Sequence, residues 1–156
     1  MLTKDGIKVI EYNARFGDPE AMNVLSILKS DFLSICISLV EGKLEKEEVL
    51  FDELATVCKY VVPLGYPNNP MKGFEVFCDQ NDSSLFLASV MFKNKKLIAC
   101  GSRTAAVVGK NRDIQKAEAF AEQGVSNISG KLFHRKDIGT KDLIDLRVKR
   151  MKELLS

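Results

Sequence analysis

The stretch Val9–Glu20, "VIEYNARFGDPE", places three polar side chains, Glu11, Asn13 and Arg15, at alternate positions before a Gly-Asp-Pro segment. We expect a β-strand from about Lys8 to Tyr12. Side chains two residues apart on a strand point to the same face, so Glu11 and Asn13 would stand side by side. The stretch therefore predicts a polar site on one face of an early β-ribbon.

The chemistry of this pattern fits a hard divalent cation. On a strand that rises ~3.3 Å per residue, the α-carbons of Glu11 and Asn13 lie about 7 Å apart, close enough to share one ion. Mg²⁺ prefers oxygen ligands and is commonly held by one or two protein groups together with substrate phosphates. Arg15 adds a guanidinium for a phosphate or carboxylate, which completes what phosphoryl transfer requires. The alternative is a solvated strand face, because so short a pattern often occurs by accident.

The flanking sequence predicts the elements around this site. A hairpin turn at Asp5-Gly6 leads into the strand, and only a few residues precede that turn. Asp18-Pro19-Glu20 can open a helix, because Asp can cap it, Pro fits its first turn and Glu favours the positive end of its dipole. A second helix begins at Ser30-Asp31 and ends at Gly42. This second helix contains the apolar run "FLSICISLV", which is too short to span a bilayer and is expected to be a buried core helix.

The remainder of the chain has a different pattern. From Ala55 onward, short β-branched and aromatic runs separated by turns, such as one at Lys93-Asn94-Lys95, predict an antiparallel sheet. Asp113 is expected to cap one helix, and another is expected from about Thr140 to Leu155. The inward face of that last helix is expected to hold Leu143, Ile144, Val148, Met151 and Leu155. We therefore expect an α+β fold with two domains, residues 1–50 and 51–156, separated within a charged loop.

Composition excludes several classes of protein. Hydrophobic residues make up 46% and charged residues 28% of 156, as in soluble globular proteins, and a net charge of +2 predicts neither nucleic acid nor a membrane as partner. No signal peptide is visible at the start of the chain. The four cysteines, Cys36, Cys58, Cys78 and Cys100, form no C-x-x-C pair. We expect ordinary buried thiols in a reducing cytoplasm.

Several segments together resemble one enzyme family. "KVIEYNARFGDPE" is similar to the metal-binding strand of ATP-grasp ligases, and its "RFGDPE" extension to the phosphoribosylamine:glycine ligase family. In family order follow "LGYPNNPMKG" (64–73), "GSRTAAVVGKNRDIQKAEAFA" (101–121) and "FHRKDIG" (133–139), which resemble its later segments. The likeness covers nearly all of the chain. It implies that residues 1–50 are the C-terminal end of an ATP-grasp domain and that residues 51–156 are the ligase's C-terminal α+β domain.

The resemblance implies a reaction in purine biosynthesis. ATP would phosphorylate the carboxylate of glycine, and the amine of 5-phosphoribosylamine would attack the acyl phosphate. Glu11 and Asn13 would bind Mg (or Mn) that carries the ATP phosphates, and Arg15 would steady the γ-phosphate or the acyl phosphate. Asp18 is left between two roles, facing the glycine amino group as a catalytic residue or capping the helix that follows.

The same resemblance implies that part of the ATP site lies elsewhere. The lysines, adenine pocket and glycine-rich flap of this family come from sequence before the metal strand, so we expect a C-terminal fragment that is inactive without the N-terminal part of the same polypeptide. Two alternatives remain open. One is a non-catalytic interaction domain derived from an ATP-grasp fold, and the other is a different carboxylate-amine ligase of the same superfamily.

Some residues are left outside the predicted site. Arg103 and Lys72 could approach phosphates, but surface or structural ion pairs are the commoner role of such residues. His134 is the single histidine and is expected at a turn or surface position, because no catalytic partner for it can be identified. Ser102 and Pro70 depart from the family pattern, which often has glycine and tyrosine at these places.

Overall fold

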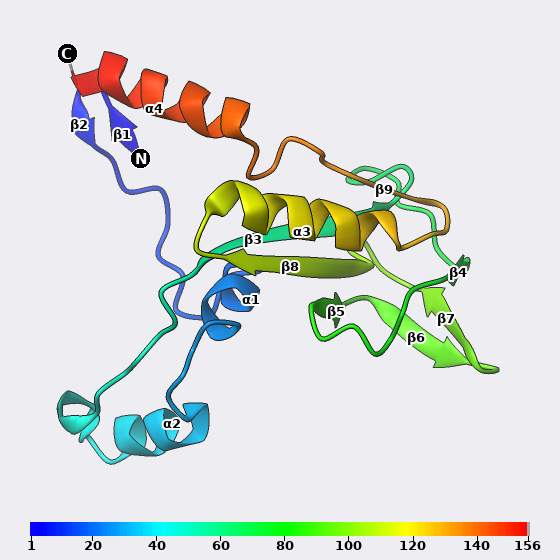
Figure 1. Ribbon diagram of the computed structural model, residues 1–156, viewed down its shortest axis with the longest axis horizontal. Coiled ribbons are helices and arrows are strands. Elements are labelled where there is room, and N and C mark those ends of the chain that lie inside the picture. Colours follow the sequence, from blue (N-terminus) through cyan, green and yellow to red (C-terminus); the bar gives the residue numbers. More distant parts are fainter. Residues whose placement is uncertain (156) are drawn as a thin grey trace.

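The structure is a computed structural model that describes residues 1–155, and its helices and antiparallel strands form an α+β fold (Figure 1). The strands are β1 (Leu2–Thr3), β2 (Gly6–Ile7), β3 (Ala55–Pro63), β4 (Glu75–Val76), β5 (Leu85–Leu87), β6 (Val90–Lys93), β7 (Lys96–Ala99), β8 (Ala105–Asn111) and β9 (Leu132–His134). The helices are α1 (Glu20–Leu25), α2 (Phe32–Val40), the 3-10 helix η1 (Leu44–Lys46), α3 (Ile114–Ser126) and α4 (Lys141–Leu155).

A four-stranded antiparallel sheet, in the order β5-β8-β3-β9, forms the centre of the fold. Its longest pairing joins β3 and β8, from Ala55 opposite Asn111 to Val61 opposite Ala105. Both strands are rich in valine and alanine and almost wholly buried, as expected for strands covered on two faces. The predicted antiparallel sheet is thus confirmed.

Helix α3 covers one face of this sheet (Figure 1). Asp113 caps it by accepting hydrogen bonds from the backbone N–H groups of Gln115 and Lys116, as predicted. The helix lies very close to β8, because a Cβ at Gly109 would be 1.9 Å from the carbonyl oxygen of Ala117. Small residues on both elements therefore set the distance between helix and sheet.

The opposite face of the sheet carries α1. Met22 packs there against Cys58, Ala106 and Val108 of β3 and β8. The short helix thereby holds the loop before it, which contains the predicted site, against the central sheet.

A second sheet, in the order β4-β7-β6, lies beside the first. Its β6–β7 hairpin turns at Asn94 and Lys95, whose φ angles of 51° and 62° are both positive. Asparagine tolerates this conformation better than most residues, and paired positive φ values match the twist of a hairpin. The turn predicted at Lys93–Lys95 is confirmed.

The N-terminal hairpin is shorter than predicted. Strand β1 pairs with β2, with Gly6 at φ 93°, and one further hydrogen bond joins Lys8 N–H to the carbonyl oxygen of Met1. The predicted strand from Lys8 to Tyr12 is wrong, because residues 8–17 have no regular structure. No described strand lies beside these residues to accept their hydrogen bonds, and an isolated two-stranded ribbon is marginal in water.

Helix α2 has the predicted ends but not the predicted burial. Asp31 caps it by accepting from the N–H of Ser34, and Gly42 follows it at φ 67°. Ser38 is its one buried residue, whereas Val40 is 87% exposed, so the prediction of a buried core helix is wrong. Figure 1 shows the reason: α2 and η1 lie at the end of an arm that extends away from the central sheet.

Helix α4 is confirmed in extent and only partly in its inward face. Leu143 and Ile144 are half-buried, whereas Val148, Met151 and Leu155 are exposed. Among residues 1–155, no helix has the length and apolar character needed to cross a membrane. The division into domains at residues 50 and 51 stays a prediction.

Candidate functional site

The predicted site residues line one shallow hollow of ≈ 420 Å³, which we call the acidic hollow. Its lining residues are Glu11, Asn13, Arg15, Gly17, Asp18 and Glu20. The structure therefore brings the predicted residues together, although on an irregular loop rather than on one face of a strand. The described part of the chain has no cluster of three His, Cys, Asp or Glu side chains suited to a metal ion.

The oxygen atoms of the acidic hollow suit magnesium better than a metal that takes all of its ligands from the protein. Glu11 and Asn13 are exposed, and within residues 1–155 neither side chain has a hydrogen-bond partner. Both oxygens are therefore available. One carboxylate and one amide fit an ion that keeps its waters and takes further oxygens from phosphates.

Arg15 keeps most of its donors. Its Nη1 donates a hydrogen bond of 2.9 Å to the carbonyl oxygen of the neighbouring Phe16. The guanidinium also acts on Asp18 through its charge. Arg15 is thus at the rim of the acidic hollow with N–H groups still able to bind an anion.

Asp18 does not cap α1, so that predicted alternative is wrong. Pro19 occupies the position before the helix, and no side chain caps it. Instead, Asp18 Oδ1 accepts a hydrogen bond of 2.7 Å from the Tyr60 hydroxyl, and its Oδ2 accepts one of 2.7 Å from Arg103 Nη1. The partial burial of Asp18 raises its pKa, but the hydrogen bonds from Tyr60 and Arg103 outweigh this and hold the pKa below its usual value.

Arg103 is the residue that connects the acidic hollow to the sheet. Its guanidinium lies 5.5 Å from the centre of the Tyr60 ring, within the range of a cation–π contact. The pKa of Arg103 is raised by its hydrogen bond with Tyr66, which has the larger effect, and by its hydrogen bond with Asp18. Sequence reasoning expected an ion pair at Arg103, which is confirmed, but it missed Tyr60. Alternation along β3, which puts Tyr60 on the same face as Cys58 and Val62, was the available signal.

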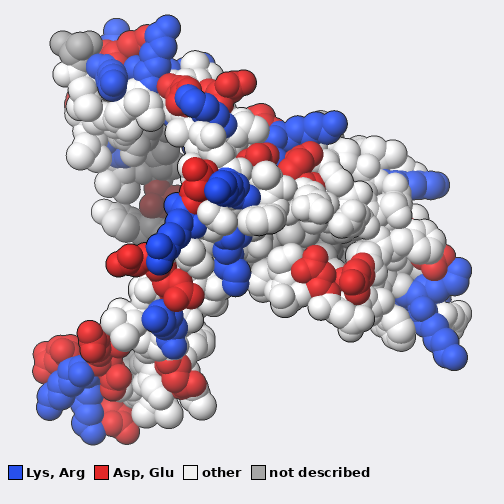
Figure 2. Space-filling view, in the orientation of Figure 1, with Lys and Arg blue, Asp and Glu red and all other residues white. Residues whose placement is uncertain are grey.

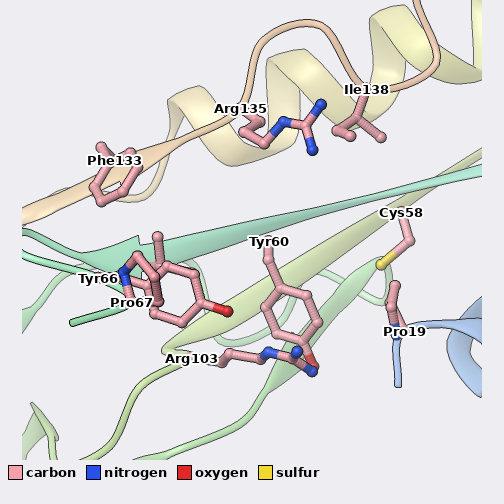
Figure 3. A pocket seen from close by; sticks show the side chains of 10 residues that line it. Pro19, Cys58, Tyr60, Tyr66, Pro67, Arg103, Phe133, Arg135 and Ile138 are labelled. Atoms are coloured by element: carbon pink, nitrogen blue, oxygen red, sulfur yellow. The ribbon is translucent and has the colours of Figure 1, made fainter. Parts of the chain in front are cut away.

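A larger cavity of ≈ 440 Å³ opens beside the acidic hollow, and we call it the aromatic cavity (Figure 3). Its lining residues are Pro19, Cys58, Tyr60, Val62, Tyr66, Pro67, Arg103, Phe133, Arg135 and Ile138. Burial, followed by the nearby charges of Asp18 and Glu20, raises the pKa of Cys58 to about 12, so its thiol stays protonated. Asp18 of the acidic hollow is hydrogen-bonded to Tyr60 and Arg103, which line the aromatic cavity.

A buried charge cluster lies on the other face of β3. Lys59, whose side chain is 0% exposed, donates to Glu118 at 2.5 Å, to Glu122 at 2.6 Å and to the carbonyl oxygen of Lys136 at 3.0 Å. His134 Nε2 lies 3.0 Å from the remaining oxygen of Glu122. His134 is therefore a strand residue within this cluster, not the turn or surface residue that the sequence predicted.

Two other residues weighed from the sequence lie apart from the acidic hollow. Lys72 is exposed and belongs to the loop before β4. Pro70 lies in the same loop, whose Gly65 has φ 86° and where a Cβ at Gly65 would lie 2.1 Å from the carbonyl oxygen of Asn69. Figure 2 shows acidic and basic side chains interspersed on the face in view, without a continuous basic surface.

Comparisons with known proteins agree on one family. The family model described as "Phosphoribosylglycinamide synthetase, C domain" matches residues 56–141. A phosphoribosylamine–glycine ligase of Methanococcus maripaludis is 52% identical over 159 residues, covering 99% of this chain and 36% of that protein. One of Methanocaldococcus jannaschii is 51% identical, with the same two coverages. This chain thus spans little more than a third of these relatives.

A solved structure supports the same conclusion. The crystal structure of a phosphoribosylamine–glycine ligase from Thermotoga maritima has a TM-score of 0.75 and 26% sequence identity. The match covers 88% of this chain and 35% of that one. The arrangement of helices and sheets described above is therefore shared with this protein.

Proposed function

Since this chain belongs to the phosphoribosylglycinamide synthetase family, we propose that it forms the C-terminal part of an ATP-dependent ligase that joins glycine to 5-phosphoribosylamine. In this reaction the glycine carboxylate takes the γ-phosphoryl group of ATP. The amine of 5-phosphoribosylamine then attacks the acyl carbon, so a C–N bond forms and inorganic phosphate leaves. The observation that carries the proposal is the acidic hollow, where Glu11, Asn13, Arg15 and Asp18 meet in a chain of this family.

Glu11 and Asn13 are the proposed ligands of Mg²⁺ or Mn²⁺. Their unpartnered oxygens belong to one irregular loop and are open to solvent, as a site that must admit nucleotide requires. A bound divalent ion would neutralise charge on the transferred phosphoryl group. Both ligands fit this ion because its remaining positions can be filled by water and phosphate oxygens.

Arg15 and Asp18 have complementary proposed roles. The free N–H groups of Arg15 suit the oxygens of a γ-phosphate or an acyl phosphate. Asp18 stays ionised because of its hydrogen bonds to Tyr60 and Arg103, and a carboxylate with a lowered pKa can hold the ammonium form of an amino acid. Asp18 is therefore proposed to orient glycine.

The N-terminal part of such a ligase is the proposed partner of this chain. Within residues 1–155 no nucleotide-binding lysine or glycine-rich flap faces the acidic hollow, whose lining is as given above. The loop leading to it exposes apolar side chains, of which Tyr12 is 90% exposed. Exposed apolar groups of this size favour docking against another segment. We propose that residues 1–156 alone do not turn over substrate.

The decisive experiment changes Glu11 in the complete ligase polypeptide. Glu11→Ala is expected to lower phosphate release that depends on both glycine and phosphoribosylamine by at least about 100-fold, because the metal loses its charged ligand. The control Glu45→Ala removes an exposed carboxylate in η1, far from the acidic hollow, and is expected to leave the rate unchanged. Full activity of Glu11→Ala at saturating Mg²⁺ would remove Glu11 from the metal site.

Phosphate release by the complete polypeptide also tests the reaction itself. Release that requires ATP but not glycine would assign the chain to another carboxylate-amine ligase. Absence of any ATP hydrolysis, with a folded protein, would support the non-catalytic interaction domain instead.

A further inference from the structure

Residues 131–138, which contain β9 and which we call the wall segment, form one side of the aromatic cavity. Phe133, Arg135 and Ile138 line the cavity from this segment. Figure 3 shows these three side chains on one side of the cavity, with Tyr60 on the other. The position of the wall segment therefore sets the width of the cavity.

The backbone attaches the wall segment to the sheet over a short distance. Strand β9 is at the edge of the sheet and pairs with β3 at three positions, from Val61 to Pro63. Pro63 has no N–H to donate. Gly130 and Gly139, with φ angles of 148° and 78°, stand at the two ends of the wall segment. Glycines in such positions can absorb a change of φ and ψ, so they can serve as hinges.

Apolar contacts anchor the two ends of the wall segment. Leu132 packs against the core around Val61. Ile138 packs against Val57 and small residues of α3. Residues 133–137 lie between these anchors, so their position depends on other contacts.

The buried charge cluster described above supplies such a contact on the face away from the cavity. The Lys59 ammonium has three N–H donors. It gives two of them to Glu118 and Glu122 of α3, at 2.5 and 2.6 Å, and the third to the Lys136 carbonyl oxygen of the wall segment, at 3.0 Å. Movement of that carbonyl would leave a buried N–H without its acceptor, which costs free energy.

His134 supplies a second bond between the wall segment and the same cluster. Two carboxylates face the single Lys59 ammonium, so the three groups together carry one excess negative charge. His134 Nε2 lies 3.0 Å from Glu122 Oε1, on the carboxylate that Lys59 also contacts. Alternation along β9 places His134 on the α3 side and Phe133 on the cavity side. Contacts behind the wall segment can thus control the cavity without entering it.

We propose that the buried charge cluster is a latch that holds the wall segment against the central sheet and thereby limits access to the aromatic cavity. With the latch intact, Phe133 and Arg135 stay opposite Tyr60, and Cys58 of the cavity lining is 8% exposed. When the latch breaks, the wall segment turns about Gly130 and Gly139 and the cavity opens to solvent. This inference goes beyond the proposed function and does not depend on it, because it concerns no substrate.

Two variants of the 156-residue chain break the latch to different degrees. Lys59→Met removes the central cation, and the milder His134→Leu removes one bond to Glu122, so the test remains available if the first variant does not fold. The control Gly124→Ala strains the packing of α3 on Val107 and leaves every group of the cluster in place.

Hydrogen exchange read by mass spectrometry compares the wall segment with β8, each relative to the unfolded chain. We expect exchange in the wall segment to be at least about 100-fold faster in Lys59→Met and about 5-fold faster in His134→Leu, because a single hydrogen bond contributes less than the buried cation. Gly124→Ala is expected to speed exchange in β8 and to leave the wall segment unchanged, because a local opening does not require α3 to separate from β8.

Iodoacetamide labelling of Cys58, relative to the exposed Cys100, tests whether this movement opens the cavity. We expect the ratio to rise about 5-fold in His134→Leu. The ratio should not depend on urea below the unfolding transition, because a local opening exposes little surface.

The outcomes are distinct. Equal acceleration of the wall segment and β8 by Gly124→Ala would show that the wall segment opens when the whole chain unfolds, which would overturn the latch. Unchanged exchange of the wall segment in the folded latch variants would do the same. Faster exchange without faster labelling of Cys58 would describe a mobile segment that does not control the cavity, and would also overturn the proposal.

Discussion

Asp18 and Arg103 lie 85 positions apart in the chain and form an ion pair of 2.7 Å between Oδ2 and Nη1. Tyr60 adds a hydrogen bond to the other oxygen of the same carboxylate. A loop without regular backbone structure is thus fixed to the central sheet by side chains.

Asp18→Asn is expected to destabilise the chain near neutral pH and to have no effect in acid. The pKa of Asp18 is lower in the folded state than its usual value of 3.8, so its stabilising contribution is full above about pH 4 and is lost as pH falls through the folded pKa. The side chain of Arg103 is 38% exposed and that of Asp18 is 52% exposed. Solvent therefore limits the loss of unfolding free energy to about 1 kcal/mol or less. Urea unfolding at pH 7 and pH 3 measures the difference, with Glu45→Gln as control. An equal loss at both pH values would contradict this account.

The cysteines are expected to differ in reactivity toward iodoacetamide at pH 8. Cys100 is exposed, whereas Cys58 is buried with a pKa raised to about 12, so Cys58 has very little reactive thiolate. Burial also raises the pKa of Cys78, which should react more slowly than Cys100. Mass spectrometry of peptides at timed intervals gives the order of labelling. Early labelling of Cys58 in the folded chain would show that β3 is accessible there.

Lys59→Met is expected to cost about 3–5 kcal/mol of unfolding free energy, because it leaves the carboxylates of Glu118 and Glu122 close together without their cation. The pKa of Glu122, which burial raises, is held below its usual value by hydrogen bonds from Lys59 and His134, so the cluster is most stabilising above about pH 4.5. Lys116→Met, at an exposed position of α3, is the matched control and should change stability little. A small loss for Lys59→Met in urea unfolding would mean that the cluster opens to water.

Gly109→Ala is expected to destabilise the fold more than Gly124→Ala. A Cβ at Gly109 would lie 1.9 Å from the Ala117 carbonyl oxygen and 2.7 Å from the Ala121 backbone nitrogen, so α3 would have to move. A Cβ at Gly124 meets the Val107 side chain at 2.6 Å, which can shift more cheaply. We expect a loss of about 3 kcal/mol or more for the first and about 1–2 kcal/mol for the second. Equal thermal midpoints would contradict the close packing of α3 on β8.

The sequence predicted those elements whose signals are local. The caps at Asp31 and Asp113, the turn at Asn94 and the apolar runs of β3 and β8 are each determined by residues within a few positions. These were confirmed. Patterns of this kind need no knowledge of the distant chain, because caps, turns and alternation act through neighbouring backbone groups.

Features that need a distant partner were missed or wrong. The expected strand at Lys8–Tyr12 has no neighbour among the described strands, and helix α2 lies away from the central sheet and its apolar core. Asp18 was weighed as a helix cap because Pro19 and Glu20 follow it. Its two carboxylate oxygens instead accept hydrogen bonds from Tyr60 and Arg103. Nothing within a few positions of Asp18 indicates those partners.

The hydrogen bonds from Tyr60 and Arg103 to Asp18 also limit which segments can be exchanged between members of this family. A chimera that takes the loop before α1 from one relative and the central sheet from another inherits residue 18 from one parent and residues 60 and 103 from the other. Where the parents differ at any of these positions, the loop would lose its anchor although both halves fold. Residues 18, 60 and 103 should therefore be transplanted together.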